Sequence, residues 1–266
     1  MKRITALKTI LLDMDGVLWR GSQPVVDIPQ LFERVQGSGK QFFCVTNNST
    51  RSVRHHLEKL RDFGVSLTAN NIITSAEASA AYLAEKYPQR GDVFMIGESG
   101  LHEALKEKGF HILEDPNGKK ALAVVVGLDK KMTYRDFDLA IRYIREGSFF
   151  VGTNPDLTIP TPTGPAPGAG AILRGLEVSS GIEPYIIGKP YSALFDLALA
   201  RANSLPEETL MIGDRLETDI LGAQRAGMLT AVVFTGIASA EQAASWHPEP
   251  DIAAETALQV LDILDS

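Results

Sequence analysis

Cysteine is almost absent from this sequence: Cys44 is the single one among 266 residues. One cysteine excludes an intrachain disulfide and a cysteine-rich metal site. Its place in the apolar run Phe42–Val45 predicts a buried core residue rather than a reactive thiol.

Basic residues are also in deficit. The chain has 26 lysines and arginines against 33 aspartates and glutamates, a formal net charge of −7. A nucleic acid or an anionic membrane would need clustered basic residues, so neither is an expected partner. A small anionic substrate is not excluded, because a metal ion and one lysine can reverse the potential locally.

Long apolar runs are missing as well. No stretch approaches the roughly 18 uninterrupted apolar residues of a membrane-spanning helix. The first apolar run is broken at Lys8 and ends at Asp13, unlike the apolar part of a secretory signal. We therefore expect a cytoplasmic protein.

What the sequence does contain is a regular alternation of short apolar runs and segments of helical period. The apolar runs predict strands at 9–13, 41–46, 93–96, 121–127, 149–152, 185–187, 209–212 and 230–233. The helical segments are 28–37, 52–63, 76–87, 100–108, 134–146, 191–202, 218–226 and 254–264. This alternation predicts the α/β class, with a doubly wound, Rossmann-like parallel sheet.

The first predicted strand ends in two acids. Asp13 and Asp15 stand two residues apart and are followed by Gly16. Residues i and i+2 of a strand face the same side, and ligands of open α/β sheets bind at the carboxyl ends of strands. Adjacent carboxylates repel each other without a cation or a shared proton, so the pair suits Mg²⁺, with one acid as nucleophile and the other as proton donor. The alternative is an ordinary polar turn, and Trp19, just after it, is expected to pack.

Another predicted strand ends in a run of hydroxyl and amide side chains from Thr46 to Thr50. A turn from a strand into a helix offers backbone N–H groups and neutral donors to an anion. The alternative is a helix cap, with Ser49 or Thr50 as the capping residue. The same donors serve both purposes.

Three charged residues follow two further predicted strands. Lys189 stands between Gly188 and Pro190, and Asp214 and Asp219 stand at the end of a strand and the start of the next helix. Carboxylates with a substrate phosphate are the ligands that Mg²⁺ usually takes. The alternatives are a solvated surface lysine, a turn acid, and an acid that complements a helix N-terminus.

The segments D-M-D-G-V-L, T-N-N-S, G-K-P and G-D-R-L-E-T-D-I resemble the haloacid dehalogenase-like superfamily. More narrowly, they resemble the branch of that superfamily that includes p-nitrophenyl phosphatases, phosphoglycolate and pyridoxal-phosphate phosphatases and nucleotide phosphatases. The resemblance extends from Asp13 to Ile220 and includes Gly152–Asp156 and Pro167–Gly170.

The resemblance implies a Mg²⁺-dependent phosphatase that forms an aspartyl-phosphate. Asp13 is then the nucleophile, and Asp15 is the general acid and base, with its backbone carbonyl on the metal. Lys189 neutralises the nucleophile and the transferring group. The remaining implied roles are phosphate binding by Thr46, Gly16, Asn47 and Asn48, metal binding by Asp214, and support of the metal shell by Asp219.

The spacing of these motifs predicts an inserted domain. Only 33 residues separate Asp13 from Thr46, but 143 separate Thr46 from Lys189, which exceeds one helical crossover by about a domain. We expect a core of 1–86 and 184–266 and an α/β cap of 87–183.

The cap is expected to choose the substrate, a small phosphorylated metabolite. Asn154, Pro155 and Asp156 are the candidate specificity residues, together with the proline-rich loop 160–167, which cannot continue a helix or a central strand. A plain turn and a stiff surface connection are the alternatives. The family resemblance also implies a homodimer formed through the cap.

Other functions on the same scaffold stay open. Asp15 speaks against a dehalogenase, which has no leaving oxygen to protonate. A phosphomutase and a catalytically idle metabolite-binding protein are the remaining alternatives. The sequence does not decide among sugar phosphates, phosphoglycolate, pyridoxal phosphate and nucleotides as substrates.

Overall fold

The structure is a computed structural model, and it describes residues 7–114, 119–161 and 163–266. The chain forms two compact units. The first consists of the described residues of Met1–Thr46, Arg54–Ile73 and Lys189–Ser266, and the second of those of Asn47–Val53 and Thr74–Gly188. In the described ranges no helix is long and apolar enough to cross a bilayer.

The first unit is a six-stranded sheet in the order β15-β14-β13-β1-β4-β5 with helices around it. Its strands are β1 (Thr9–Leu12), β4 (Gln41–Thr46), β5 (Ile72–Thr74), β13 (Thr209–Gly213), β14 (Leu229–Val233) and β15 (Ile252–Ala254), and β2 (Trp19–Arg20) and β3 (Gln23–Pro24) form a separate hairpin. Its helices are α1 (Ile28–Gly37), α2 (Val53–Asp62), α7 (Ser192–Ala202), α8 (Leu221–Ala226), α9 (Ala240–Ser245) and α10 (Ala257–Asp265), with short turns η2 (Ala69–Asn71), η3 (Pro206–Glu208) and the π-helical η4 (Leu216–Ile220).

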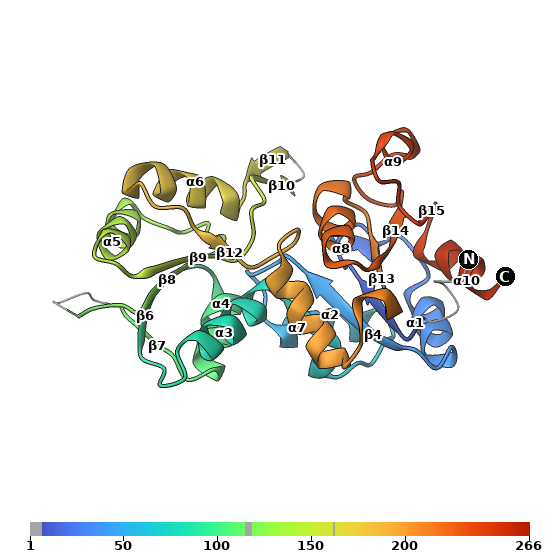
Figure 1. The fold of residues 1–266 in the computed structure, drawn as a ribbon, viewed down its shortest axis with the longest axis horizontal. Coiled ribbons are helices and arrows are strands. Elements are labelled where there is room, and N and C mark those ends of the chain that lie inside the picture. Colours follow the sequence, from blue (N-terminus) through green and yellow to red (C-terminus); the bar gives the residue numbers. More distant parts are fainter. Residues whose placement is uncertain (1–6, 115–118, 162) are drawn as a thin grey trace. The chain divides into compact units, whose positions relative to one another are not determined.

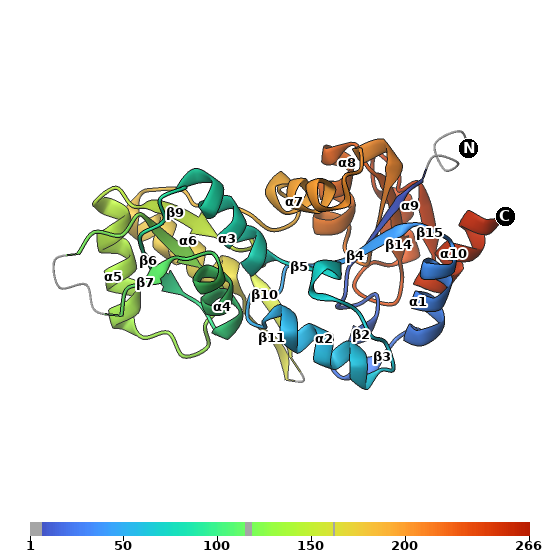
Figure 2. The ribbon, with the colours of Figure 1, turned by 90° about the horizontal axis from the view of Figure 1, so that it is seen from below.

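The central strands of this sheet are buried on both faces. Every residue of β1, β13 and β14 is buried, as expected for parallel strands covered by helices on each side. Helices α7 and α8 lie together on one side of the sheet, and α1 and α10 lie together on the other (Figure 2). The pairs of β1 with β4 and with β13 are both parallel. This confirms the doubly wound α/β fold.

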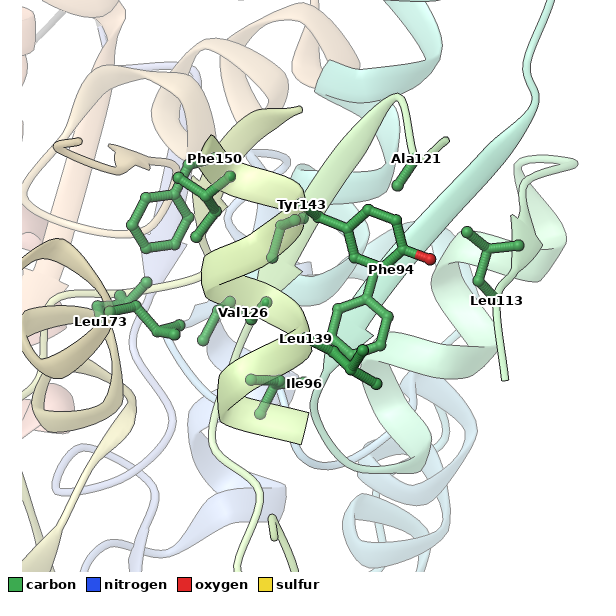
Figure 3. Close-up of a cluster of buried hydrophobic side chains, with 13 residues drawn as sticks. Phe94, Ile96, Leu113, Ala121, Val126, Leu139, Tyr143, Phe150 and Leu173 are labelled. Atoms are coloured by element: carbon green, nitrogen blue, oxygen red, sulfur yellow. The ribbon is translucent and has the colours of Figure 1, made fainter. Parts of the chain in front are cut away.

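The second unit has its own five-stranded sheet in the order β12-β9-β8-β6-β7 (Figure 1). Its strands are β6 (Asp92–Ile96), β7 (His111–Ile112), β8 (Ala123–Val126), β9 (Phe149–Gly152) and β12 (Tyr185–Ile186), and its helices are α3 (Ser75–Lys86), α4 (Ser99–Glu107), α5 (Tyr134–Arg145) and α6 (Ala169–Ser180). Helices α5 and α6 cover one face of this sheet, with α3 and α4 on the other (Figure 1). The rings of Phe94 in β6 and Tyr143 in α5 lie 5.3 Å apart, in a buried apolar cluster that includes Leu139 and Leu173 (Figure 3).

The proline-rich segment forms an antiparallel hairpin of β10 (Thr158–Thr161) and β11 (Gly164–Pro167). Pro160 pairs with Pro165, and Pro162 lies outside the described residues. The hairpin is a sheet of its own, in agreement with the expectation that these prolines exclude a central strand.

The two compact units and the expected domains differ at one helix. Helix α3 packs on α4 and therefore belongs to the second unit, whereas the motif spacing predicts a cap that starts at residue 87. The segment Asn47–Val53 also falls in the second unit. The cap boundaries of 87–183 stay a prediction.

Candidate active site

The site lies where the strand order of the first sheet reverses. The chain goes from β1 to β4 on one side and later to β13 on the other. A crevice forms at the carboxyl ends of the strands at such a switch point. Asp13 directly follows β1, Thr46 ends β4, and Asp214 directly follows β13. The main-chain N–H of Asp13 donates to the carbonyl of Ile212 at 2.9 Å, so the two strand ends are held side by side.

Three carboxylates converge at this edge. Asp13, Asp214 and Asp219 each offer an oxygen, and these oxygens lie within 4.8 Å of one another. All three residues are buried. Like charges this close in a buried site require a cation, a proton or both. Three of the four candidate acids thus lie together, and Asp15 is not in this group.

Lys189 supplies one positive charge to this group. Its Nζ lies 2.6 Å from Oδ1 of Asp13 and 2.6 Å from Oδ1 of Asp219, and it donates to the carbonyl of Val45 at 3.0 Å. Only 2% of the residue is exposed. The alternative of a solvated surface lysine is therefore wrong.

The ionisation of the group follows from its burial and its charges. Burial raises the pKa of Asp13 well above its ordinary value; Lys189 opposes this rise, and Asp219 and Asp214 add to it. Burial, with Asp219, raises the pKa of Asp214 to about 7. Burial disfavours the charged form of Lys189, but Asp13 and Asp219 outweigh it and raise the pKa of the ammonium group. One ammonium ion is thus set against three acids.

The unpaired part of this charge lies on Asp214. Its Oδ2 accepts a hydrogen bond from the N–H of Ile237 at 2.8 Å. Its Oδ1 is buried and has no hydrogen-bond partner in the part of the chain that the structure describes. A buried carboxylate oxygen without a donor is costly. The oxygen donors and the excess negative charge fit a divalent cation of the Mg²⁺ type.

Gly16 is required by the geometry of the turn that follows Asp13. Its φ is +92°, which disfavours any residue with a side chain. A Cβ at this position would also overlap the carboxylate of Asp214. The turn thus brings its backbone against the acid group.

Asp15 is placed differently from the other acids. The residue is exposed, and its Oδ1 accepts a hydrogen bond from Nε1 of Trp19 at 2.9 Å. The indole of Trp19 is buried, as expected for a packing residue. Its bond to Asp15 was not predicted from the sequence.

The loop after β14 is a part of the site that the sequence analysis missed. Ile237 is not its only contact with Asp214: the N–H of Ala238 donates to the main-chain carbonyl of Asp214 at 2.9 Å. The hydroxyl of Thr235 donates to the carbonyl of Gly16 at 2.6 Å, and a Cβ at Gly236 would overlap Asp214. The sequence feature that could have indicated this loop is a predicted strand followed by a Thr-Gly pair, at the same sheet edge as the other motifs.

Arg20 reinforces this loop. Its guanidinium donates to the carbonyls of Thr235 at 2.6 Å and Gly236 at 2.7 Å. Charge-assisted bonds of this kind are among the stronger hydrogen bonds of a protein. The β2–β3 hairpin and the loop that holds Asp214 are therefore tied together.

The other predicted residues belong to the second unit. Asn47 donates through Nδ2 to Oδ2 of Asp156 at 3.3 Å, and Asn154 donates to the carbonyl of Asn47 at 2.8 Å. The carbonyl of Asn47 also accepts from the hydroxyl of Ser75 at 2.7 Å. These bonds fix the orientation of the Asn47 carbonyl, while Oδ1 of Asn48 accepts from its near neighbour Thr50, at the main-chain N–H and the hydroxyl.

The helix-cap alternative for Ser49 and Thr50 does not hold. Helix α2 begins at Val53, beyond the reach of a cap at either residue. Ser49 is buried instead, and its hydroxyl accepts from that of Thr153 at 3.1 Å.

Known proteins match this chain along almost all of its length. Residues 10–111 match the family model of haloacid dehalogenase-like hydrolases, and residues 186–260 match a second model described as HAD-hydrolase-like. The 5'-nucleotidase YutF of Bacillus subtilis is 35% identical over 234 residues, which are 88% of this chain and 90% of that protein. An acid sugar phosphatase of Staphylococcus aureus is 35% identical over 243 residues, 91% of this chain and 92% of that protein.

A solved structure agrees with these sequence matches. The p-nitrophenyl phosphatase from Archaeoglobus fulgidus superposes with a TM-score of 0.90 at 29% identity, over 97% of this chain and 99% of that one. The chain belongs to the haloacid dehalogenase-like hydrolases and is an enzyme. Within that family, the proteins that it resembles are phosphatases and a nucleotidase.

Proposed function

We propose that this enzyme is a Mg²⁺-dependent phosphatase that hydrolyses small phosphomonoesters through an aspartyl-phosphate on Asp13. One observation carries the proposal: three buried carboxylates and one buried ammonium group converge at the switch point of the sheet. The relatives with phosphatase and nucleotidase names support the reaction class.

The metal ligands in this proposal are Asp13, Asp214 and the backbone carbonyl of Asp15. Asp219 supports the shell, because its Oδ2 accepts from the N–H of Arg215 at 3.1 Å and its other oxygen pairs with Lys189. When bound, Mg²⁺ neutralises charge on the transferring phosphoryl group. Cytoplasmic location and pairing through the cap remain predictions from the sequence.

In the first step the carboxylate of Asp13 attacks phosphorus and the bond to the leaving oxygen breaks. Asp15 gives its proton to that oxygen, so the product leaves as an alcohol. Lys189 holds Oδ1 of Asp13 at 2.6 Å, which fixes the nucleophile and offsets charge as the new bond forms. Thr46, the backbone of Asn47, and Asn48 bind phosphate oxygens in this proposal, with Gly16 shaping the turn.

In the second step water attacks the phosphorus of the aspartyl-phosphate. Asp15, now a carboxylate, accepts the proton of that water. The bond between Asp13 and phosphorus breaks, which releases inorganic phosphate and restores both acids. Two steps of lower barrier thus replace one direct hydrolysis.

Substrate choice is assigned to Asn154 and Asp156 in the second unit. Both have hydrogen bonds to Asn47, next in the chain to Thr46. The names of the relatives make sugar phosphates and nucleoside monophosphates the first candidates. A panel compared by kcat/KM measures this discrimination.

Release of inorganic phosphate tests the proposal. Purified enzyme is given p-nitrophenyl phosphate, a sugar phosphate and a nucleoside monophosphate, each with Mg²⁺ and with EDTA. Phosphate release that requires Mg²⁺ supports the proposal. Phosphate release that is the same with EDTA contradicts the metal assignment. Transfer of the phosphoryl group within the sugar, without release of phosphate, indicates a phosphomutase. If none of the esters is hydrolysed, the protein is not a phosphatase.

A further inference from the structure

The buried side chain of Trp19 has one polar atom, and that atom is bonded to an exposed acid. Trp19 is 1% exposed, and its Nε1 donates to Oδ1 of Asp15 at 2.9 Å. The aspartate itself is exposed to solvent. An exposed carboxylate ordinarily samples several rotamers, but this one has a fixed partner.

The main chain between the two residues sets up this contact. The N–H of Gly16 donates to the carbonyl of Trp19 at 2.7 Å, and the N–H of Leu18 donates to the carbonyl of Met14 at 2.9 Å. The chain thereby closes a tight turn from Asp15 to Trp19. The indole and the carboxylate leave the two ends of that turn, so their bond depends on the turn being formed.

The indole ring is itself held in place by residues at the end of α2. Phe63 stacks on the ring with centroids 5.7 Å apart. Nζ of Lys59 lies 3.8 Å from the ring centroid and donates to the carbonyl of Gly21 at 2.8 Å. The ring therefore has little freedom to turn its N–H away from Asp15.

We infer that Trp19 is a positioning residue, which holds one oxygen of Asp15 so that the other is aimed at the leaving group. This inference rests on the proposed function, in which Asp15 is the general acid. Proton transfer needs the acid within hydrogen-bond reach of the leaving oxygen. Only one carboxylate oxygen is bonded to the indole, so the second stays available for the proton.

The competing explanation is that the bond merely satisfies a buried indole N–H, as buried tryptophans usually require. The two explanations differ in their effect on leaving groups. Loss of a positioned acid harms esters whose leaving oxygen needs a proton, whereas a general structural defect harms all esters alike. Phenyl phosphate and p-nitrophenyl phosphate make a matched pair, because the nitro group makes the phenolate a much better leaving group.

The test is kcat/KM for both esters in Trp19→Phe, which keeps an aromatic ring and removes the donor. The ratio kcat/KM reports the steps up to release of the phenol, so it isolates the acid step from the later hydrolysis. We expect the loss to be about tenfold greater for phenyl phosphate than for p-nitrophenyl phosphate, with KM little changed. Equal losses for the two esters, or no loss, would overturn the inference.

The chain contains its own control. Trp246 is the other tryptophan, and its Nε1 donates to Oε1 of Gln224 at 3.2 Å. Trp246→Phe removes a bond of the same kind and is expected to treat the two esters as the wild type does. Failure of the wild type to hydrolyse either ester would contradict the proposed function; selective failure in Trp19→Phe addresses Trp19 alone.

Fluorescence provides a second test that does not require Trp19→Phe to fold. In the Trp246→Phe enzyme Trp19 is the remaining indole, and Asp15→Ala removes its partner at an exposed position. We expect the emission of Trp19 to shift, because the carboxyl oxygen that accepts the hydrogen bond of the indole N–H is lost. Unchanged emission would show that the two side chains do not interact and would overturn the inference.

Discussion

Nζ of Lys189 lies 2.6 Å from Oδ1 of Asp13, although 176 residues separate the two in the sequence. Both side chains are almost completely buried. The ammonium group also contacts Asp219 and donates to the carbonyl of Val45. The nucleophile of the proposed reaction and its counter-charge are thus part of one buried network.

Lys189→Met should destabilise the enzyme strongly. It leaves buried acids without their cation, and removal of one partner from a buried ion pair costs about 3–5 kcal/mol. Urea unfolding at neutral pH in EDTA measures this cost. Lys8→Met is the matched control: Lys8 pairs with Glu208 at the same 2.6 Å, but its side chain is 65% exposed, so about 0–1 kcal/mol is expected. Equal costs for the two variants would contradict the buried network.

Asp214 should make the metal-free enzyme less stable as the pH rises. The pKa of Asp214 is about 7 in the fold, against an ordinary value of 3.8. Between these two values the native state binds more protons than the unfolded state, so the free energy of unfolding falls with increasing pH. Asp214→Asn keeps an oxygen for the N–H of Ile237 and removes the charge. In EDTA at pH 8 this variant should have a larger free energy of unfolding than the wild type. Urea unfolding of both proteins at several pH values measures the difference. If the difference in the free energy of unfolding between the two proteins does not grow from pH 4 to pH 8, the pKa of Asp214 is not raised in the fold.

Mg²⁺ should stabilise the fold more at high pH than at low pH. A metal ion competes with protons for the same carboxylates, and Asp13 and Asp214 both hold their protons to a higher pH than usual. We expect the rise in Tm on addition of Mg²⁺ to be larger at pH 8 than at pH 5, and to disappear in Asp214→Asn. The same rise at both pH values, or in the variant, would place the metal elsewhere.

Gly16→Ala should abolish activity for a reason beyond backbone strain. An alanine at this position must adopt a positive φ, which costs about 1 kcal/mol. Its Cβ also collides with Asp214. Gly21, in the turn between β2 and β3, separates the two effects, since its φ is +58° and nothing lies within 4 Å of a Cβ there. Gly21→Ala should lose stability but keep kcat and Mg²⁺ affinity. If the two variants lose activity equally, the contact with Asp214 does not matter.

The sequence predicted some elements at their observed bounds and missed others. Strands β4 and β9 and helix α1 have the predicted bounds, because a continuous apolar run or a clear period of 3.6 defines each. Strand β5 was missed because it has three residues, too few for a pattern. Helix α6 was missed because it follows the proline-rich hairpin and contains Gly170 and Gly175, which read as loop residues.

The site was predictable to the extent that it depends on strand ends. Asp13, Lys189, Asp214 and Asp219 come together because parallel strands share one carboxyl edge. The bond between Trp19 and Asp15 and the support of Asp214 by Ile237 were not predictable. Both depend on how a turn or a loop closes in three dimensions, which residue spacing alone does not specify.

Turnover of p-nitrophenyl phosphate by Asp13→Asn tests the proposed chemistry most directly. The substitution is nearly isosteric and removes the attacking carboxylate. Turnover is measured at saturating Mg²⁺, and thermal unfolding shows whether the variant is folded. We predict a folded protein with no turnover, and acid-quenched wild type that carries a phosphoryl group on the peptide containing Asp13. Wild-type turnover by Asp13→Asn, or a phosphoryl group on a different peptide, would contradict an aspartyl-phosphate at this residue.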